Sequence, residues 1–220
     1  MMRSTGVLAL VAFALVASAA TASAASEAEE GVYFSFLMGL KDGIETEGEW
    51  ATDGVHVEVS IKEAGASTEE KLFSKHCQHK VWSEHKIKLA KYHDKIVNLS
   101  VLVNAGPSGN SNFDWFVLGQ PTVEVSGKYH HKSLLVGHPF KVETTVVPKE
   151  KGGEASVYPK VKAGSAADPG KYLVGGEEKE GIYIHPPFQN VVGDTKITFE
   201  LDLGGKPKTF QHASAHDDIL

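Results

Sequence analysis

Residues 53–65 read DGVHVEVSIKEAG, and two further segments follow, KLFSKHCQHKVWSEHKIKLAKYHDKIVNLSVLVNAG (71–106) and NSNFDWFVLGQPTVEV (110–125). In the first segment, every second residue from Val55 to Ile61 is apolar and the residues between are polar. A period of two places alternate side chains on opposite faces of an extended chain. The pattern therefore predicts a β-strand with one buried and one hydrated face.

The same alternation recurs later in the chain, at residues 97–103, 140–146 and 197–203. Gly-, Pro- and Asn-rich turns separate the segments, as in NAGPSGNSN (104–112). Outside the first 24 residues, no segment of about 12 residues or more carries the apolar spacing of a helix. We predict an all-β protein, an antiparallel β-sandwich or jelly roll.

Three further segments are interpreted as extended pieces. Residues 81–89 form a less regular strand, in which Trp82 is expected to be a core residue. Two short strands are expected at 113–117 and 121–125. Aromatic and β-branched residues, which favour strands, are frequent in all three.

The chain begins as a secretory signal does. Arg3 supplies a basic start, residues 6–20 are apolar, and Ala22-Ser23-Ala24 offers small residues for cleavage. The apolar run of about 15 residues is shorter than the roughly 20 needed to span a bilayer. We expect residues 1–24 to be a removed signal peptide and the protein to be secreted or periplasmic, with no membrane span.

The charge balance argues against nucleic acid as a partner. The chain holds 22 Lys and Arg against 28 Asp and Glu, and Arg3 is the only arginine. Without Arg3 the balance is 21 − 28 = −7. An acidic surface that lacks guanidinium groups attracts phosphate poorly. Cys77 is the lone cysteine, so the chain forms no internal disulfide.

Several of these segments resemble a known family. The run DGVHVEVSIKEAG, the strand with Trp82, and KIVNLSVLVNAGPSGNSNFDWFVLGQPTVEV are similar to NPCBM modules, jelly-roll carbohydrate-binding modules found beside glycoside hydrolases. The Phe113-Asp114-Trp115-Phe116 run, followed by Gly119 and Pro121, looks like the family's Asp-Trp stretch. The similarity covers about 75 residues and implies a sugar-binding function without catalytic residues.

The order of the blocks differs from the family's. GIYIHPPFQNVVGDTKITFELDL (181–203) looks like the opening strands of such a module but stands at the C-terminal end. A circular permutation, a pair of incomplete modules or a truncated gene would explain this order. We favour one closed sandwich, because a half-module would expose apolar edges. We therefore expect one domain over 25–220, in which 31–127 matches best, 128–180 is a long connection and 181–220 completes the sandwich. Residues 198–203 should then share a core with 55–61.

Sugar binding needs a flat aromatic ring beside polar groups that can reach hydroxyls. Trp50 lies in an acidic loop and is the first candidate platform. Trp115, with Asn112 and Asp114 beside it, follows a turn-rich loop and is the second. We predict these four residues as the ligand-binding set, although each Trp could instead serve packing.

Two clusters in the sequence contain residue types that can bind metal ions, but neither has the spacing of a known metal site. The acids Asp42, Glu45, Glu47, Glu49 and Asp53 offer the oxygen ligands that calcium prefers, but they match no defined calcium loop. His76-Cys77-Gln78-His79 (76–79) offers thiolate and imidazole but lacks a second pair at a convincing spacing. We predict no transition-metal site and no required cofactor, with a structural calcium ion as the open alternative.

No catalytic motif is present: the chain has no G-x-S-x-G, no HExxH and no phosphate loop. We therefore predict a secreted, non-catalytic carbohydrate-binding protein whose partner is a glycan or polysaccharide. The alternatives are a structural or protein-interaction sandwich of the cell envelope, and a metal-binding or hydrolytic protein built on the His and acidic clusters. Exposure of Trp50 and Trp115 would favour the sugar-binding hypothesis.

Overall fold

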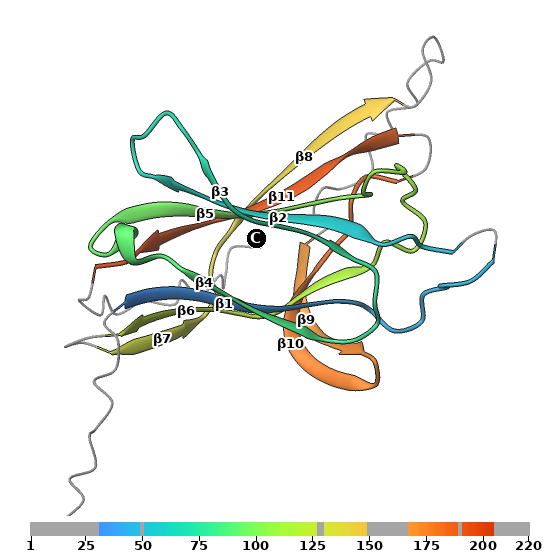
Figure 1. Cartoon of the computed structure of the whole chain (residues 1–220), viewed down its shortest axis with the longest axis horizontal. Coiled ribbons are helices and arrows are strands. Elements are labelled where there is room, and N and C mark those ends of the chain that lie inside the picture. Colours follow the sequence, from blue (N-terminus) through green and yellow to red (C-terminus); the bar gives the residue numbers. More distant parts are fainter. Residues whose placement is uncertain (1–30, 49–50, 127–129, 149–166, 189–190, 205–220) are drawn as a thin grey trace, which may run out of the picture.

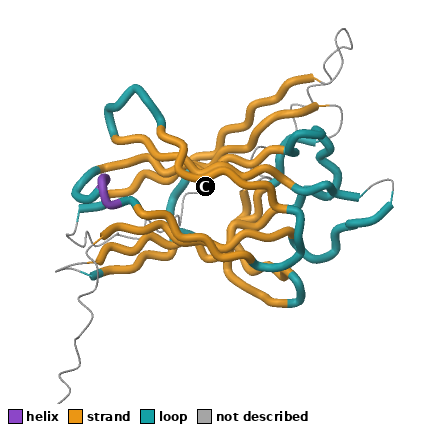
Figure 2. Tube along the Cα trace, in the orientation of Figure 1, coloured by secondary structure: helices purple, strands orange, loops and turns teal. Residues whose placement is uncertain are grey.

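The structure is a computed structural model that describes residues 31–48, 51–126, 130–148, 167–188 and 191–204. Strands lie in two layers, with loops gathered at both ends (Figures 1 and 2). The first layer, sheet A, has the order β4-β1-β6-β10-β9, and β7 also pairs with β6. Sheet B has the order β3-β2-β5-β11-β8. All pairings are antiparallel, which confirms the predicted all-β sandwich.

The strands of sheet A are β1 (Gly31–Leu40), β4 (Ser83–Lys88), β6 (Phe116–Ser126), β7 (His131–Leu134), β9 (Ala167–Val174) and β10 (Glu177–Ile184). Those of sheet B are β2 (Val55–Glu63), β3 (Glu70–Cys77), β5 (Ile96–Asn104), β8 (Lys141–Pro148) and β11 (Val191–Asp202). Within the described residues, the only helical element is the short 3₁₀ turn Ala90–Tyr92. No helix among them is long and apolar enough to cross a membrane.

The core lies between the two sheets and joins both halves of the chain. Phe199 and Leu201 of β11 belong to the same buried cluster as Val57 and Val59 of β2. Strand β11 lies inside sheet B, between β5 and β8, so its residues are not an appendage. The prediction that 198–203 share a core with 55–61 is confirmed. The jelly-roll form of the sandwich stays a prediction.

The segment 128–180 contains more structure than a connection. Strands β7, β8 and β9 and the start of β10 lie within it. Strand β7 has only four residues, too few to show a period in the sequence. Strand β9 contains Pro169 and Gly170, which usually mark loops, but both are tolerated in a strand at the edge of a sheet.

The two short pieces predicted at 113–117 and 121–125 form one strand, β6, which begins at Phe116. Pro121 lies inside this strand at an irregularity, where Gln120 has a positive φ of 43° and the pairing with β1 shifts. A bulge leaves a residue outside the hydrogen-bonded ladder, which is where a proline without an N–H is tolerated. This bulge shapes the outer face of sheet A.

Candidate functional site

The structure places Asp114 inside the protein. Its side chain has 0 % exposure, and the Thr52 hydroxyl donates a 2.7 Å hydrogen bond to Asp114 Oδ1. Burial raises the pKa of Asp114 to about 7, and the nearby charge of Asp53 adds to the rise. The prediction that Asp114 contacts a surface sugar is corrected, because the carboxyl group does not reach solvent.

Trp115 is half-buried and packs against the core, so its ring is not fully exposed for stacking on a sugar. Its ring centroid lies 5.7 Å from that of Phe113, and Lys41 Nζ lies 5.2 Å from the ring. Asn112 is also half-buried, and its backbone N–H donates to Asn110 Oδ1. These contacts leave Trp115 a restricted surface for a ligand.

Trp50 lies outside the described residues, so its predicted role stays a prediction. Among the acidic residues of the same loop, Asp42 is held by the turn between β9 and β10. Its two carboxylate oxygens accept 2.8 Å hydrogen bonds from the backbone N–H groups of Gly175 and Gly176. Glu45 and Glu47 are exposed, and Glu49 also lies outside the described residues.

The His76–His79 segment gives no metal geometry. Cys77 is buried, and burial raises the pKa of its thiol to about 11, so the metal-binding thiolate is disfavoured. His76 Nε2–H donates to the Asp53 carbonyl oxygen at 2.8 Å. Within the described ranges, no group of three or more His, Cys, Asp or Glu side chains is placed to hold a metal ion.

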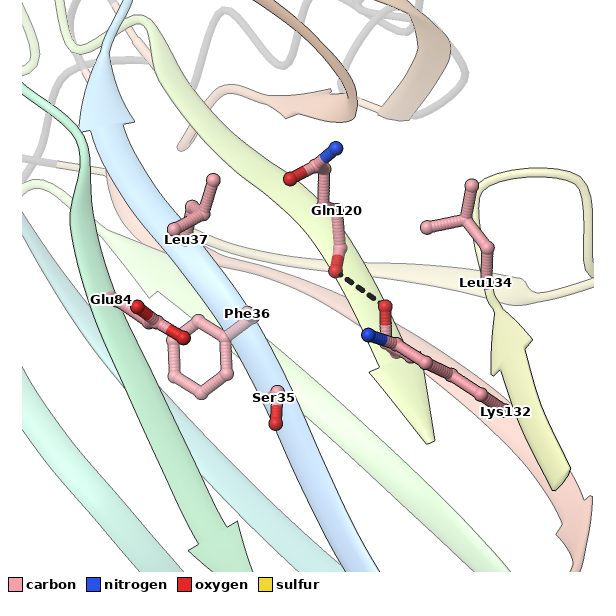
Figure 3. Close-up of a pocket in the computed structure, with 8 residues that line it drawn as sticks. Ser35, Phe36, Leu37, Glu84, Gln120, Lys132 and Leu134 are labelled. Carbon is pink, nitrogen blue, oxygen red and sulfur yellow. Dashed lines mark hydrogen bonds between the residues drawn. The ribbon is translucent and has the colours of Figure 1, made fainter. Parts of the chain in front are cut away.

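An open groove of about 410 Å³ lies on sheet A, over the bulge in β6 (Figure 3). Its lining comes from four neighbouring strands: Ser35, Phe36, Leu37, Glu84, Gln120, Thr122, Lys132 and Leu134. Glu84 on β4 and Lys132 on β7 stand on opposite sides of the β1–β6 pair. The groove is therefore built from residues that lie up to about 100 positions apart in the chain.

The bulge explains why the sheet is hollowed here. Leu37 pairs with Gly119, but the next registered pair is Ser35 with Thr122, so Gln120 and Pro121 together oppose Phe36. The Thr122 hydroxyl donates a 2.8 Å hydrogen bond to the Gln120 carbonyl oxygen and stabilises the irregularity (Figure 3). A bulge bends its strand and redirects the side chain at the extra residue. Gln120 accordingly is exposed at the groove.

The groove combines hydrogen-bonding groups with an apolar patch. Ser35, Gln120 and Thr122 carry neutral donors and acceptors, and Glu84 and Lys132 add one charge of each sign. Leu37 and Leu134 supply the apolar part, and Leu134 is 43 % exposed. Such a lining can orient a polar ligand by its hydroxyl groups while covering a small apolar face.

Trp82 lies beside Leu37, one of the residues that line the groove, and is not part of the core that the sequence predicted for it. A Cβ atom at Gly119 would lie 2.7 Å from Trp82 Cζ3 and 3.1 Å from Leu37 Cβ, so the ring rests on Gly119 beside Leu37. The half-buried indole donates its Nε1–H to the Glu177 carbonyl oxygen at 3.0 Å. This position was predictable from the sequence, because residues 82 and 84 point to the same side of an extended chain and Glu84 is exposed to solvent.

No family model, no curated protein and no solved structure matches this chain. The likeness to NPCBM modules therefore rests only on the residues quoted for it. The groove and the sandwich carry the functional argument.

Proposed function

We propose that this protein is a secreted, non-catalytic glycan-binding β-sandwich that holds part of a sugar chain in the groove of sheet A. One observation carries the proposal: the open groove of about 410 Å³ joins hydrogen-bonding side chains to the apolar patch of Leu37 and Leu134. Small-ligand sites commonly enclose about 300–1,000 Å³ and place a few polar groups on an apolar lining.

The chemistry of a sugar fits this lining. A pyranose ring carries hydroxyl groups around its rim and C–H groups on its faces, so it needs polar partners at the sides and an apolar or aromatic surface beneath. Glu84 and Lys132 can accept from and donate to hydroxyls from opposite sides. Trp82, whose ring rests on Gly119, adds aromatic surface next to Leu37.

The lining supports binding more than hydrolysis. Glycoside hydrolysis commonly uses two carboxyl groups that flank the scissile bond. Among the residues that line the groove, Glu84 is the single carboxylate. The proposal therefore assigns the groove recognition alone.

A glycan array, followed by calorimetry on any sugar that binds, tests the proposal. Glu84→Ala and Lys132→Ala should each weaken binding about tenfold or more, because hydrogen bonds to charged groups contribute about 1.5–3 kcal/mol. Glu143→Ala, an exposed acid on β8 of sheet B, is the matched control and should bind as the wild type does. Absence of binding across the array would refute the proposal and favour the structural or protein-interaction alternative.

A further inference from the structure

Two buried carboxylate oxygens without partners lie at the end of the sandwich, away from the groove's lining. They are Asp53 Oδ1 and Asp114 Oδ2. The loop residues around them, 51–54 and 108–114, are called the carboxylate junction below. Buried polar atoms are satisfied in most folded proteins, so two orphans in one junction require an explanation.

Hydrogen bonds hold each carboxylate by its other oxygen. The Thr52 hydroxyl donates to Asp114 Oδ1, and the Ser108 hydroxyl donates to Asp53 Oδ2. The backbone N–H of Gly54 in turn donates to Thr52 Oγ1 at 2.9 Å. Both side chains are thus oriented by neighbours that leave one oxygen of each unused.

The electrostatics of the junction are unbalanced. Asp53 is close enough for its charge to act on Asp114, whose side chain is fully buried. Among the ion pairs of the described residues, none involves Asp53 or Asp114. Burying carboxylates without a counter-charge is costly, and placing two near each other costs more.

We propose that the carboxylate junction binds a divalent cation of the calcium class, with Asp53 Oδ1 and Asp114 Oδ2 as its charged ligands. Calcium takes six to eight oxygen ligands and accepts carbonyl, amide and water oxygens beside carboxylates. Asn110 and Asn112 in the same loop carry amide groups of this kind. A cation here would supply the missing partner to both orphan oxygens and join the 51–54 loop to the 108–114 loop.

This position differs from the one that the acidic loop predicted. Of the five acids in that loop, Asp53 is the one that belongs to the junction, while Asp42 is engaged by the β9–β10 turn. The second ligand, Asp114, comes from a segment about 60 residues later and was predicted to contact sugar. The inference does not rest on the proposed glycan-binding function.

Cation binding can be tested on the whole protein after treatment with a chelator. Adding Ca²⁺ at about 100 times its dissociation constant should raise the midpoint of thermal unfolding by roughly 5–10 °C. Tb³⁺, a calcium substitute, should luminesce when tryptophan is excited, because Trp115 adjoins Asp114. Mg²⁺ and Zn²⁺ serve as comparison ions, and Ca²⁺ should give the largest thermal shift.

Variants decide whether these two residues are the ligands. Asp114→Asn and Asp53→Asn should each abolish the Ca²⁺-dependent shift and the Tb³⁺ signal, whereas Glu178→Gln, an exposed acid on β10, should keep both. If Asp114→Asn does not fold, Asp53→Asn carries the test. If neither Ca²⁺ nor chelator changes the unfolding midpoint of the wild-type protein, the proposal is overturned. If Asp114→Asn is then as stable as the wild type, the Asp114 carboxyl group is protonated rather than bound to a cation. A Ca²⁺ shift that persists in both variants would overturn the assignment of the ligands.

Discussion

Replacing Phe199 by alanine tests whether the last strand completes the core. Phe199 lies in β11, is fully buried, and pairs across the sheet with Leu99 of β5. Its ring meets that of Phe140 edge-on, with centroids 5.6 Å apart. Truncation would leave a cavity in the one cluster shared by residues from both halves of the chain.

The expected loss of stability is large. Truncating a buried Phe to Ala costs about 3–5 kcal/mol, and the lost edge-to-face contact places Phe199→Ala in the upper part of that range. Total stabilities are about 5–15 kcal/mol, so this single change would remove a substantial fraction. With a urea m-value of about 2–3 kcal/mol/M, a loss of about 4–5 kcal/mol should lower the unfolding midpoint by roughly 1.3–2.5 M.

Equilibrium urea unfolding, followed by tryptophan fluorescence, measures this change. Glu200→Ala is the matched control, because Glu200 is the exposed neighbour on the same strand. Its effect should stay within about 0.5 kcal/mol. A cost below about 1 kcal/mol for Phe199→Ala, or two separate unfolding transitions in the wild type, would refute the shared core.

Three further predictions concern the folded chain. Burial, with a smaller effect of the Lys75 charge, lowers the pKa of His85, so the unfolded chain binds that proton more readily. The contribution of His85 to stability should therefore fall as the pH drops from about 6.5 to 5, and denaturant titrations should show the wild type losing stability relative to His85→Gln over this range. Burial raises the pKa of the Cys77 thiol to about 11, so little of the reactive thiolate is present at pH 8. Cys77 should therefore react with a thiol reagent at this pH roughly two orders of magnitude more slowly than the unfolded chain does. An equal rate would contradict the burial of Cys77. Gly54→Ala should destabilise the protein by about 1–3 kcal/mol more than Gly65→Ala in chemical denaturation. Both glycines have a positive φ, but a Cβ at Gly54 would lie 2.3 Å from the Cys77 carbonyl oxygen, whereas a Cβ at Gly65 would meet nothing within 4 Å. Equal losses of stability would argue against the close contact at Gly54.

Periodicity made the main strands predictable. Strand β2 alternates strictly because its inner face meets the core and its outer face meets water, and Val55 to Ile61 follow that division. Strand β11 could be identified for the same reason, although its place inside sheet B could not. Short or irregular edge strands such as β7 and β9 carry too few core-facing residues to impose a period.

The candidate site was much less predictable, because it depends on pairing between distant segments. The bulge at Gln120 arises from the register between β1 and β6, which lie about 85 residues apart in the sequence. Asp114 was predicted to be a surface ligand because it stands beside Trp115 after a polar loop, yet the loop folds so that Thr52 covers it. The outward placement of Trp82 likewise follows from which face of β4 meets the core.

The most direct test of the proposed function is a map of where sugar contacts the protein. Backbone amide resonances should be followed by NMR while a sugar identified on the array is added. We predict that the largest shifts cluster at Ser35, Leu37, Gln120 and Leu134, on the outer face of sheet A. Shifts confined to the loop around Trp115, or spread without a cluster, would contradict the assignment of the groove.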